Sequence, residues 1–168
     1  MTIYIGIDPG LNGGIVVIDE TEKVLYKQIM PTVDGNKKDY DIKGIHQMLF
    51  GFVFGPRQKY TRGNVVVILE KQYVRPVSGK RSCWMNGFGY GLLKMSINVH
   101  EYQTEIVNPQ TWMKGLGISS KDGKGSVKYC LDKYPGEDWT ATERSKKPHD
   151  GMTDAACIAL FGKRLIRK

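Results

Sequence analysis

The chain opens with an alternation of hydrophobic and other residues that is typical of a β-strand. Ile3, Ile5 and Ile7 recur at every second position, which predicts a strand that ends at Asp8, just before Pro9. Similar patterning predicts further strands over 15–18, 24–30, 65–69 and 102–107. It also predicts helices over 41–53, 82–98, 109–116 and 150–167, and one more helix that begins after Gly125 and ends at Tyr134. The run over 65–69 is apolar throughout, as expected of a central strand covered on both faces.

This order of elements predicts an α/β fold. Three strands followed by alternating helices and strands favour one mixed five-stranded sheet with helices on both faces. The 168 residues contain no internal repeat and no linker long enough to separate domains, so we expect a single domain over 1–168. A chain of this length buries enough surface to fold without a disulfide or a structural metal.

The positive charge is concentrated in the second half of the chain. The net charge of +8 arises after residue 70, and the segment from Lys71 to His100 contains no acidic residue. Such a one-sided field attracts a polyanion, most commonly nucleic acid, although a solvated basic face is the alternative. Within this segment Arg75, Lys80 and Arg81 are candidate DNA-binding residues.

The composition argues against several other classes of protein. No apolar run approaches the roughly 18 residues of a membrane span, and the first residues lack the basic and apolar regions of a signal peptide. Three widely separated cysteines without a CxxC spacing argue against a disulfide framework or a zinc knuckle. We therefore expect a cytoplasmic protein with no membrane partner.

Acidic residues stand at the ends of two predicted strands and at the start of the last helix. Asp8 ends the first strand, and Glu70 ends the apolar run. A carboxylate at a buried strand end is costly unless it is paired or binds a metal, although a cap or a lysine ion pair would account for either residue alone. Asp150 and Asp154 lie four residues apart and share one helix face. Compensation of the helix dipole explains Asp150 better than Asp154, whose neighbours are apolar.

Together these four acids suit a pair of magnesium ions. Hard cations take oxygen ligands, and two of them about 4 Å apart can activate a water and stabilise the leaving oxygen of a phosphodiester. The spacing of the acids thus indicates a metal-dependent phosphodiester hydrolase.

Several segments, in the same order along the chain, resemble RuvC-type Holliday junction resolvases, which have a ribonuclease H-like fold. The segments are IGIDPG at 5–10, LEKQY at 69–73 and KPHDGMTDAA at 147–156. Between them, FGYG at 88–91 and NPQTW at 108–112 resemble the phage-type branch of that family. The resemblance covers nearly the whole chain.

The resemblance implies a site for two Mg²⁺ ions, with Mn²⁺ as a substitute. The acids that it assigns to the metals are Asp8, Glu70 and Asp154. It also implies one further ligand just before Asp154. The position three residues before Asp154 is Gly151, which cannot ligate, so the fourth ligand is Asp150, favoured by helical geometry, or His149.

The resemblance also implies contacts with DNA. Tyr73 matches an aromatic residue that stacks on a base at the opened crossover, whereas a core tyrosine is the alternative. Lys124 matches a lysine near the scissile phosphate, where it would stabilise transition-state charge or hold the backbone. Lys114 and Lys121 match the family less closely.

The protein implied by this resemblance is a homodimeric, Mg²⁺-dependent endonuclease. It would cut four-way DNA junctions in paired strands during recombination and repair in a bacterial or phage-infected cell, since a two-fold dimer matches the symmetry of a junction. A nuclease for flaps and forks, and a non-catalytic junction-binding protein, are the alternatives. Gly87, Gly89 and Gly91 do not form a dinucleotide-binding loop, and they favour close approach of the backbone to DNA or to a second subunit.

Overall fold

The computed structural model describes residues 1–35, 37–52, 60–73, 77–119 and 125–166. Strands and helices follow one another in the predicted order, and a short 3₁₀ helix precedes β6. The elements are β1 (Ile3–Asp8), β2 (Gly14–Asp19), β3 (Val24–Ile29), β4 (Thr32–Val33), β5 (Asp39–Tyr40), α1 (Ile42–Gly51), the 3₁₀ helix η1 (Arg62–Asn64), β6 (Val65–Glu70), α2 (Lys80–Val99), β7 (Gln103–Val107), α3 (Pro109–Leu116), α4 (Gly125–Lys133) and α5 (Asp150–Ile166).

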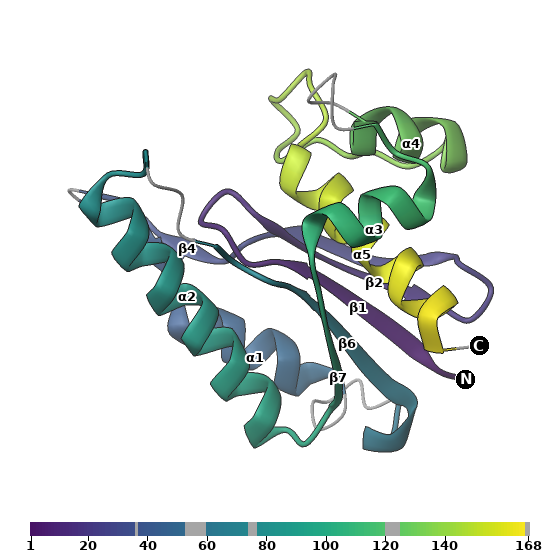
Figure 1. The fold of residues 1–168 in the computed structure, drawn as a ribbon, viewed down its shortest axis with the longest axis horizontal. Coiled ribbons are helices and arrows are strands. Elements are labelled where there is room, and N and C mark those ends of the chain that lie inside the picture. The colour runs from purple at the N-terminus through teal and green to yellow at the C-terminus, as the bar shows by residue number, and fades with distance from the viewer. Residues whose placement is uncertain (36, 53–59, 74–76, 120–124, 167–168) are drawn as a thin grey trace.

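The main sheet has five strands in the order β3-β2-β1-β6-β7 (Figure 1). β1, β2 and β3 form an antiparallel meander, whereas β6 and β7 run parallel to β1. The predicted mixed sheet is therefore confirmed. Because β1 and β6 are adjacent and parallel, their carboxyl ends lie at the same edge of the sheet.

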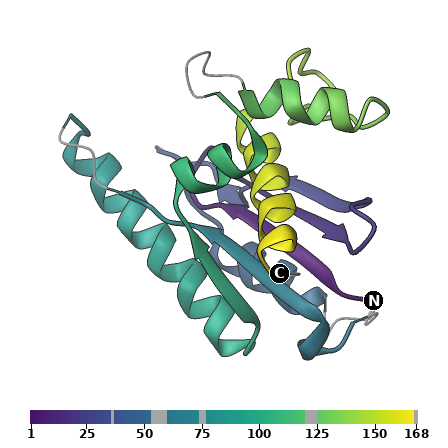
Figure 2. The same cartoon turned by 45° about the vertical axis from the view of Figure 1, so that its right-hand side comes forward.

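Helices cover both faces of this sheet, as predicted. Figures 1 and 2 show α1 and α2 on one side and α3, α4 and α5 on the other, with α5 crossing the central strands. The two-residue period of the strands separates two cores. Alternate side chains such as Ile5 and Val67 pack toward α1 and α2, and their neighbours such as Tyr4 and Ile68 pack toward α5.

Helix α5 lies in direct backbone contact with β1. A Cβ atom on Gly6 would be 2.0 Å from the carbonyl oxygen of Ala155 and 2.5 Å from the nitrogen of Ala159, so only glycine fits there. Gly162 is packed equally closely against Ile68 of β6. These contacts fix where the first turn of α5 meets the sheet edge.

The structure contains a small sheet that the sequence pattern did not predict. β4 and β5 pair as a separate two-stranded antiparallel sheet between β3 and α1. Each strand has two residues, which is too short to show a hydrophobic period. Among the described residues, no helix is long and apolar enough to cross a membrane.

Candidate active site

Asp8 and Glu70 occupy equivalent places on neighbouring strands. The parallel register pairs Ile7 of β1 with Leu69 of β6, and each acid follows directly after that pair. Both acids are partly exposed, in contrast to the fully buried residues before them. Since side chains alternate along a strand, both belong to the face that α5 covers. The prediction that Asp8 and Glu70 each end a strand is confirmed, and the structure shows that the two strands are adjacent.

The first turn of α5 lies against the turn between β1 and β2. Gly13 and Gly151 form an isolated parallel bridge. A Cβ atom on Gly151 would lie 2.4 Å from the carbonyl oxygen of Asn12, so no side chain fits at this position. Gly151, three residues before Asp154, is therefore excluded as a metal ligand for two reasons: glycine has no side chain, and the packing leaves no room for one.

The carboxylates of Asp8 and Asp154 are close enough to repel each other. Burial, together with the charge of Asp154, raises the pKa of Asp8 to about 7. Burial also raises the pKa of Asp154, and the nearby Asp150 raises it further, whereas a hydrogen bond with Ser126 lowers it. None of the ion pairs formed within the described ranges involves Asp8 or Asp154. The two carboxylates thus share a site that lacks a compensating cation from the described residues.

The chemistry of these groups fits a hard divalent cation. Carboxylate oxygens are the preferred ligands of Mg²⁺ and Mn²⁺, and an unneutralised acidic pair is favoured electrostatically by a bound cation. In the part of the chain that the structure describes, no group of three or more His, Cys, Asp or Glu residues is already arranged to hold a metal ion. Among the four candidate acids, the carboxylates of Asp8 and Asp154 interact directly in the described structure, and Asp150 acts on Asp154.

The two candidates for the fourth ligand have different surroundings. The His149 carbonyl accepts hydrogen bonds from the backbone nitrogens of Met152 and Thr153, and its Nδ1 accepts from Met152 at 3.3 Å, so His149 caps α5. Asp150 is exposed in the first turn of α5 and acts electrostatically on Asp154. Capping thus occupies Nδ1 of His149, whereas the Asp150 side chain takes no part in it.

A pocket of about 590 Å³ opens beside Asp8. The turn between β1 and β2 forms one wall, and the start of α2, including Arg81 and Asn86, forms the other. Tyr40 of β5 supports the turn, because its hydroxyl donates to the carbonyl oxygen of Pro9 at 2.9 Å. One carboxylate of the candidate site therefore faces a space that a segment of substrate could enter.

Tyr73 is not a core residue. Its side chain is 51% exposed, and its hydroxyl donates to Oδ1 of Asn108. The ammonium group of Lys71 lies 5.2 Å from the centre of its ring. Tyr73 also lines a second pocket, of about 460 Å³, together with the first residues of α3. An exposed ring beside a pocket near the end of β6 is available for stacking.

The predicted basic residues fall partly within the described ranges. Lys80 and Arg81 are exposed in the first turn of α2, and Lys114 is exposed in the last turn of α3. Three further predicted residues lie outside the described residues: Arg75, Lys121 and Lys124.

One prediction about the glycines of α2 is wrong. A Cβ atom on Gly89 would lie 2.1 Å from the ring of Tyr40, so this glycine allows close packing within the chain and not against DNA or a second subunit. Gly87 and Gly91, by contrast, have open space beside them.

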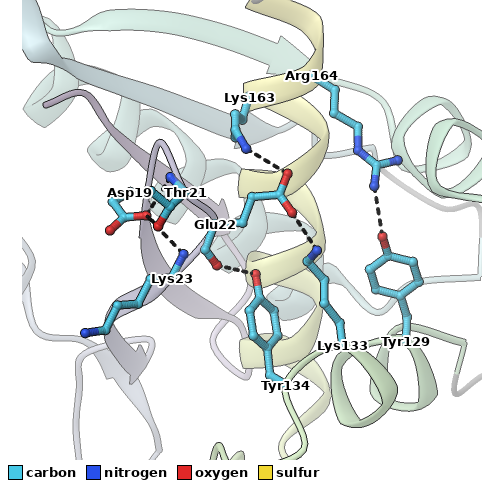
Figure 3. A network of polar contacts seen from close by, with 9 residues as sticks. All are labelled: Asp19, Thr21, Glu22, Lys23, Tyr129, Lys133, Tyr134, Lys163 and Arg164. Atoms are coloured by element: carbon cyan, nitrogen blue, oxygen red, sulfur yellow. Dashed lines mark hydrogen bonds and ion pairs between the residues drawn. The ribbon is translucent and has the colours of Figure 1, made fainter.

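A polar network holds α4 in place, as Figure 3 shows. Glu22, in the turn between β2 and β3, accepts hydrogen bonds from Lys133 of α4 and Lys163 of α5 at 2.5 and 2.8 Å. These contacts outweigh the effect of burial and lower the pKa of Glu22 to about 2. The Tyr134 hydroxyl donates to the Glu22 carbonyl oxygen. The network fixes the helix whose first turn brings Ser126 to Asp154.

The sequence did not indicate three residues near the site, namely Ser126, Tyr40 and Lys38. The ammonium nitrogen of Lys38 lies 3.1 Å from Oδ1 of Asn12. Ser126 is buried and contacts both Thr153 and Asp154. Each of these residues reaches the site from a segment distant in the sequence, so no local pattern marks it. The signal that could have indicated Ser126 is its place one residue after Gly125, at the start of a helix.

Comparison with known proteins gives matches to solved structures alone. No protein-family profile and no curated protein matches the sequence. Thermus thermophilus RuvC in complex with a Holliday junction substrate matches with a TM-score of 0.66 at 13% identity, covering 99% of this chain and 96% of that chain. Another structure of Thermus thermophilus RuvC matches with a TM-score of 0.57 at 15% identity and the same coverage. The chain therefore has the ribonuclease H-like α/β fold of RuvC, as its sequence predicted.

Proposed function

We propose that this protein is a divalent-metal-dependent endonuclease that resolves four-way DNA junctions by paired cleavage. The observation that supports the proposal is the close approach of the Asp8 and Asp154 carboxylates at the sheet edge where Glu70 ends the strand next to β1. No ion pair among the described residues neutralises Asp8 or Asp154. The fold shared with RuvC, one structure of which contains a Holliday junction substrate, supports the choice of substrate.

In this mechanism the acids act as ligands. Asp8, Glu70 and Asp154, with Asp150 as the favoured fourth member, would hold two Mg²⁺ ions, with Mn²⁺ as a substitute. Ions held by these acids would supply activation of a water and stabilisation of the leaving oxygen. Ser126 orients the Asp154 carboxylate by a hydrogen bond, and the pocket beside Asp8 admits the strand to be cut. Lys124 is proposed to contact the scissile phosphate.

A second copy of the chain would supply the second incision. Trp84, Phe88, Met95 and Val99 follow the i, i+4, i+11, i+15 pattern of one helical face along α2 and are all exposed. Large exposed apolar faces favour association. We propose that this face forms a two-fold dimer, which would present one site to each of two junction strands. The protein would act in recombination and repair in the cytoplasm of a bacterial or phage-infected cell.

A substrate panel tests this function. A synthetic four-way junction, a flap, a fork and a linear duplex are incubated side by side with Mg²⁺ or with chelator. We expect cleavage of the junction with Mg²⁺ but not with chelator, and little cleavage of the duplex. Equal cleavage of flaps and forks would favour the broader nuclease, and junction binding without cleavage would favour a non-catalytic binding protein.

Removal of the Tyr73 ring is expected to impair junction cleavage. Stacking of a base on an aromatic ring is worth roughly 1–3 kcal/mol, so Tyr73→Ala should lower the cleavage rate by about fivefold to a hundredfold. Tyr73→Phe keeps the ring and should remain near wild type. Since Tyr73 is half exposed, the melting temperature of both variants should change little. A large loss of stability in Tyr73→Ala, with normal cleavage by the folded fraction, would contradict the stacking role.

Junction affinity is expected to fall steeply with salt. Each phosphate neutralised by a basic side chain contributes about −0.9 to the slope of log affinity against log salt. Replacement of Lys80 and Arg81 by Glu should weaken binding to junction and duplex together and flatten this slope. Gel-shift titrations over a range of KCl concentrations measure both effects. An affinity of the wild-type protein that does not depend on salt would show that the start of α2 faces away from DNA.

A further inference from the structure

The two-stranded β4–β5 sheet brings Lys38 to the edge of the candidate site. The Lys38 ammonium lies 3.1 Å from Oδ1 of Asn12, a residue that lines the pocket beside Asp8. It is also near enough to His149, at the start of α5, for its charge to act on that imidazole. Lys38 thus contacts the turn that follows Asp8 and lies near the residue that precedes α5.

The position of Lys38 is fixed by the packing of its neighbours. Tyr40, two residues later, is buried, with its ring against Gly89 of α2 and its hydroxyl on the carbonyl oxygen of Pro9. The backbone nitrogen of Met30 donates to the carbonyl oxygen of Gly13 just before β4. The small sheet is therefore held at its base on the same turn that follows Asp8.

Lys38 and Arg81 place two positive charges beside the pocket. Arg81 donates from Nη2 to the carbonyl oxygen of Lys38 at 3.1 Å, which joins the start of α2 to this sheet. Neither residue belongs to the ion pairs that the described residues form, whereas Lys27, Lys133 and Lys163 each pair with a glutamate. Cations without a carboxylate partner beside an open pocket suit a phosphate group.

We propose that Lys38 is a DNA-contacting residue of the cleavage site, and that its ammonium binds a phosphate of the strand that enters the pocket next to Asp8. This inference rests on the proposed function, because it assigns a ligand to the same site. Arg81 acts as a positioning residue for Lys38 through the backbone. The hydrogen bond to Asn12 holds the Lys38 ammonium in place before DNA binds. A phosphate oxygen then takes the place of Asn12 as acceptor, or accepts a second hydrogen bond from the same ammonium.

The adjacent Lys37 provides a matched control. It is exposed on the same short segment, and no hydrogen bond among the described residues joins its ammonium to Asn12. Lys38→Gln removes the charge but keeps a hydrogen-bond donor for Asn12, and Lys38→Arg keeps the charge. Lys37→Gln removes an equal charge from the neighbouring residue. Junction affinity is measured in chelator, so that the comparison does not depend on cleavage.

We expect Lys38→Gln to weaken junction binding about tenfold at low salt and to lower the salt slope by about one. Lys38→Arg should restore most of the affinity, and Lys37→Gln should change it much less. A junction with single neutral methylphosphonates placed around the cut position identifies the phosphate. At one position, the neutral methylphosphonate should weaken junction binding by the wild-type protein and by the Lys37→Gln variant, but not by the Lys38→Gln variant.

Equal effects of Lys38→Gln and Lys37→Gln, with the same methylphosphonate profile, would overturn the inference. So would a lower melting temperature of Lys38→Gln with unchanged affinity of its folded fraction, because that result assigns Lys38 a structural role. If the wild type binds the junction but does not cut it, the proposed cleavage fails, whereas the binding comparison still decides the role of Lys38.

Discussion

Asp154→Asn is expected to lower the rate of junction cleavage on the order of a thousandfold, because loss of a metal ligand removes several kcal/mol of transition-state stabilisation. Asp154 lies on α5, where its charge acts on Asp8 and its carboxylate accepts a hydrogen bond from Ser126. Junction affinity should stay within about twofold of wild type, since phosphate contacts by basic residues dominate binding. Single-turnover cleavage with Mg²⁺ and gel shifts in chelator measure the two quantities separately.

Asp132→Asn provides a control for the loss of one acidic side chain. Asp132 is exposed on α4, the helix that contributes Ser126 to the site, so its amide variant should cut at the wild-type rate. If Asp154→Asn also cuts normally, the assignment of Asp154 to the metal site is wrong. A parallel loss of affinity and cleavage in Asp154→Asn would instead indicate a role in binding DNA.

Asp8→Asn is expected to stabilise the metal-free protein at pH 8 by up to about 4 kcal/mol, because the amide removes a carboxylate that the folded state disfavours. Burial and Asp154 raise the pKa of Asp8 from 3.8 to about 7. Between these two values the folded protein holds a proton that the unfolded chain has released. Wild-type stability should therefore fall as pH rises through this window, and the dependence should be weaker in Asp8→Asn.

Chemical denaturation at pH 4 and pH 8 in chelator tests this expectation. Asp19→Asn serves as a control, because it should destabilise the protein at pH 8, whereas Asp8→Asn should stabilise it. Hydrogen bonds from Thr21 and Lys23 outweigh burial and lower the pKa of Asp19, so its ionised form stabilises the folded state. Mg²⁺ should raise the melting temperature of wild type at pH 8 but not that of Asp8→Asn. If Asp8→Asn is less stable than wild type at pH 8 in chelator, the account of a repelling carboxylate pair is wrong.

The sheet could be predicted because its strands carry strong local patterns. Alternation at Ile3, Ile5 and Ile7 and the apolar run over 65–69 marked two strands, which the structure places side by side in the sheet. The β4–β5 sheet could not be predicted, because its formation depends on contacts made by Tyr40 with Pro9 and Gly89. Such contacts join segments far apart in the chain and leave no period in the sequence.

The places of the candidate acids at the ends of strands and at the start of a helix could be predicted, whereas their electrostatic coupling could not. Strand ends at Asp8 and Glu70 follow from local pattern, but the pKa of Asp8 depends on how α5 crosses β1. The sequence likewise could not decide whether Tyr73 is a core residue, because that depends on how exposed the residue is in the folded chain. Ser126 and Lys38 reach the site by tertiary packing, which composition and spacing do not encode.

The most direct test of the central claim is strand-by-strand mapping of cleavage on a four-way junction. Each of the four strands is labelled in turn at its 5′ end, and the wild-type protein is added with Mg²⁺. The account predicts incisions at symmetrical positions in two opposed strands, and nicked duplex products with 5′-phosphates that a ligase seals. Incision of one strand alone, or an intact junction after saturating protein and Mg²⁺, would contradict it.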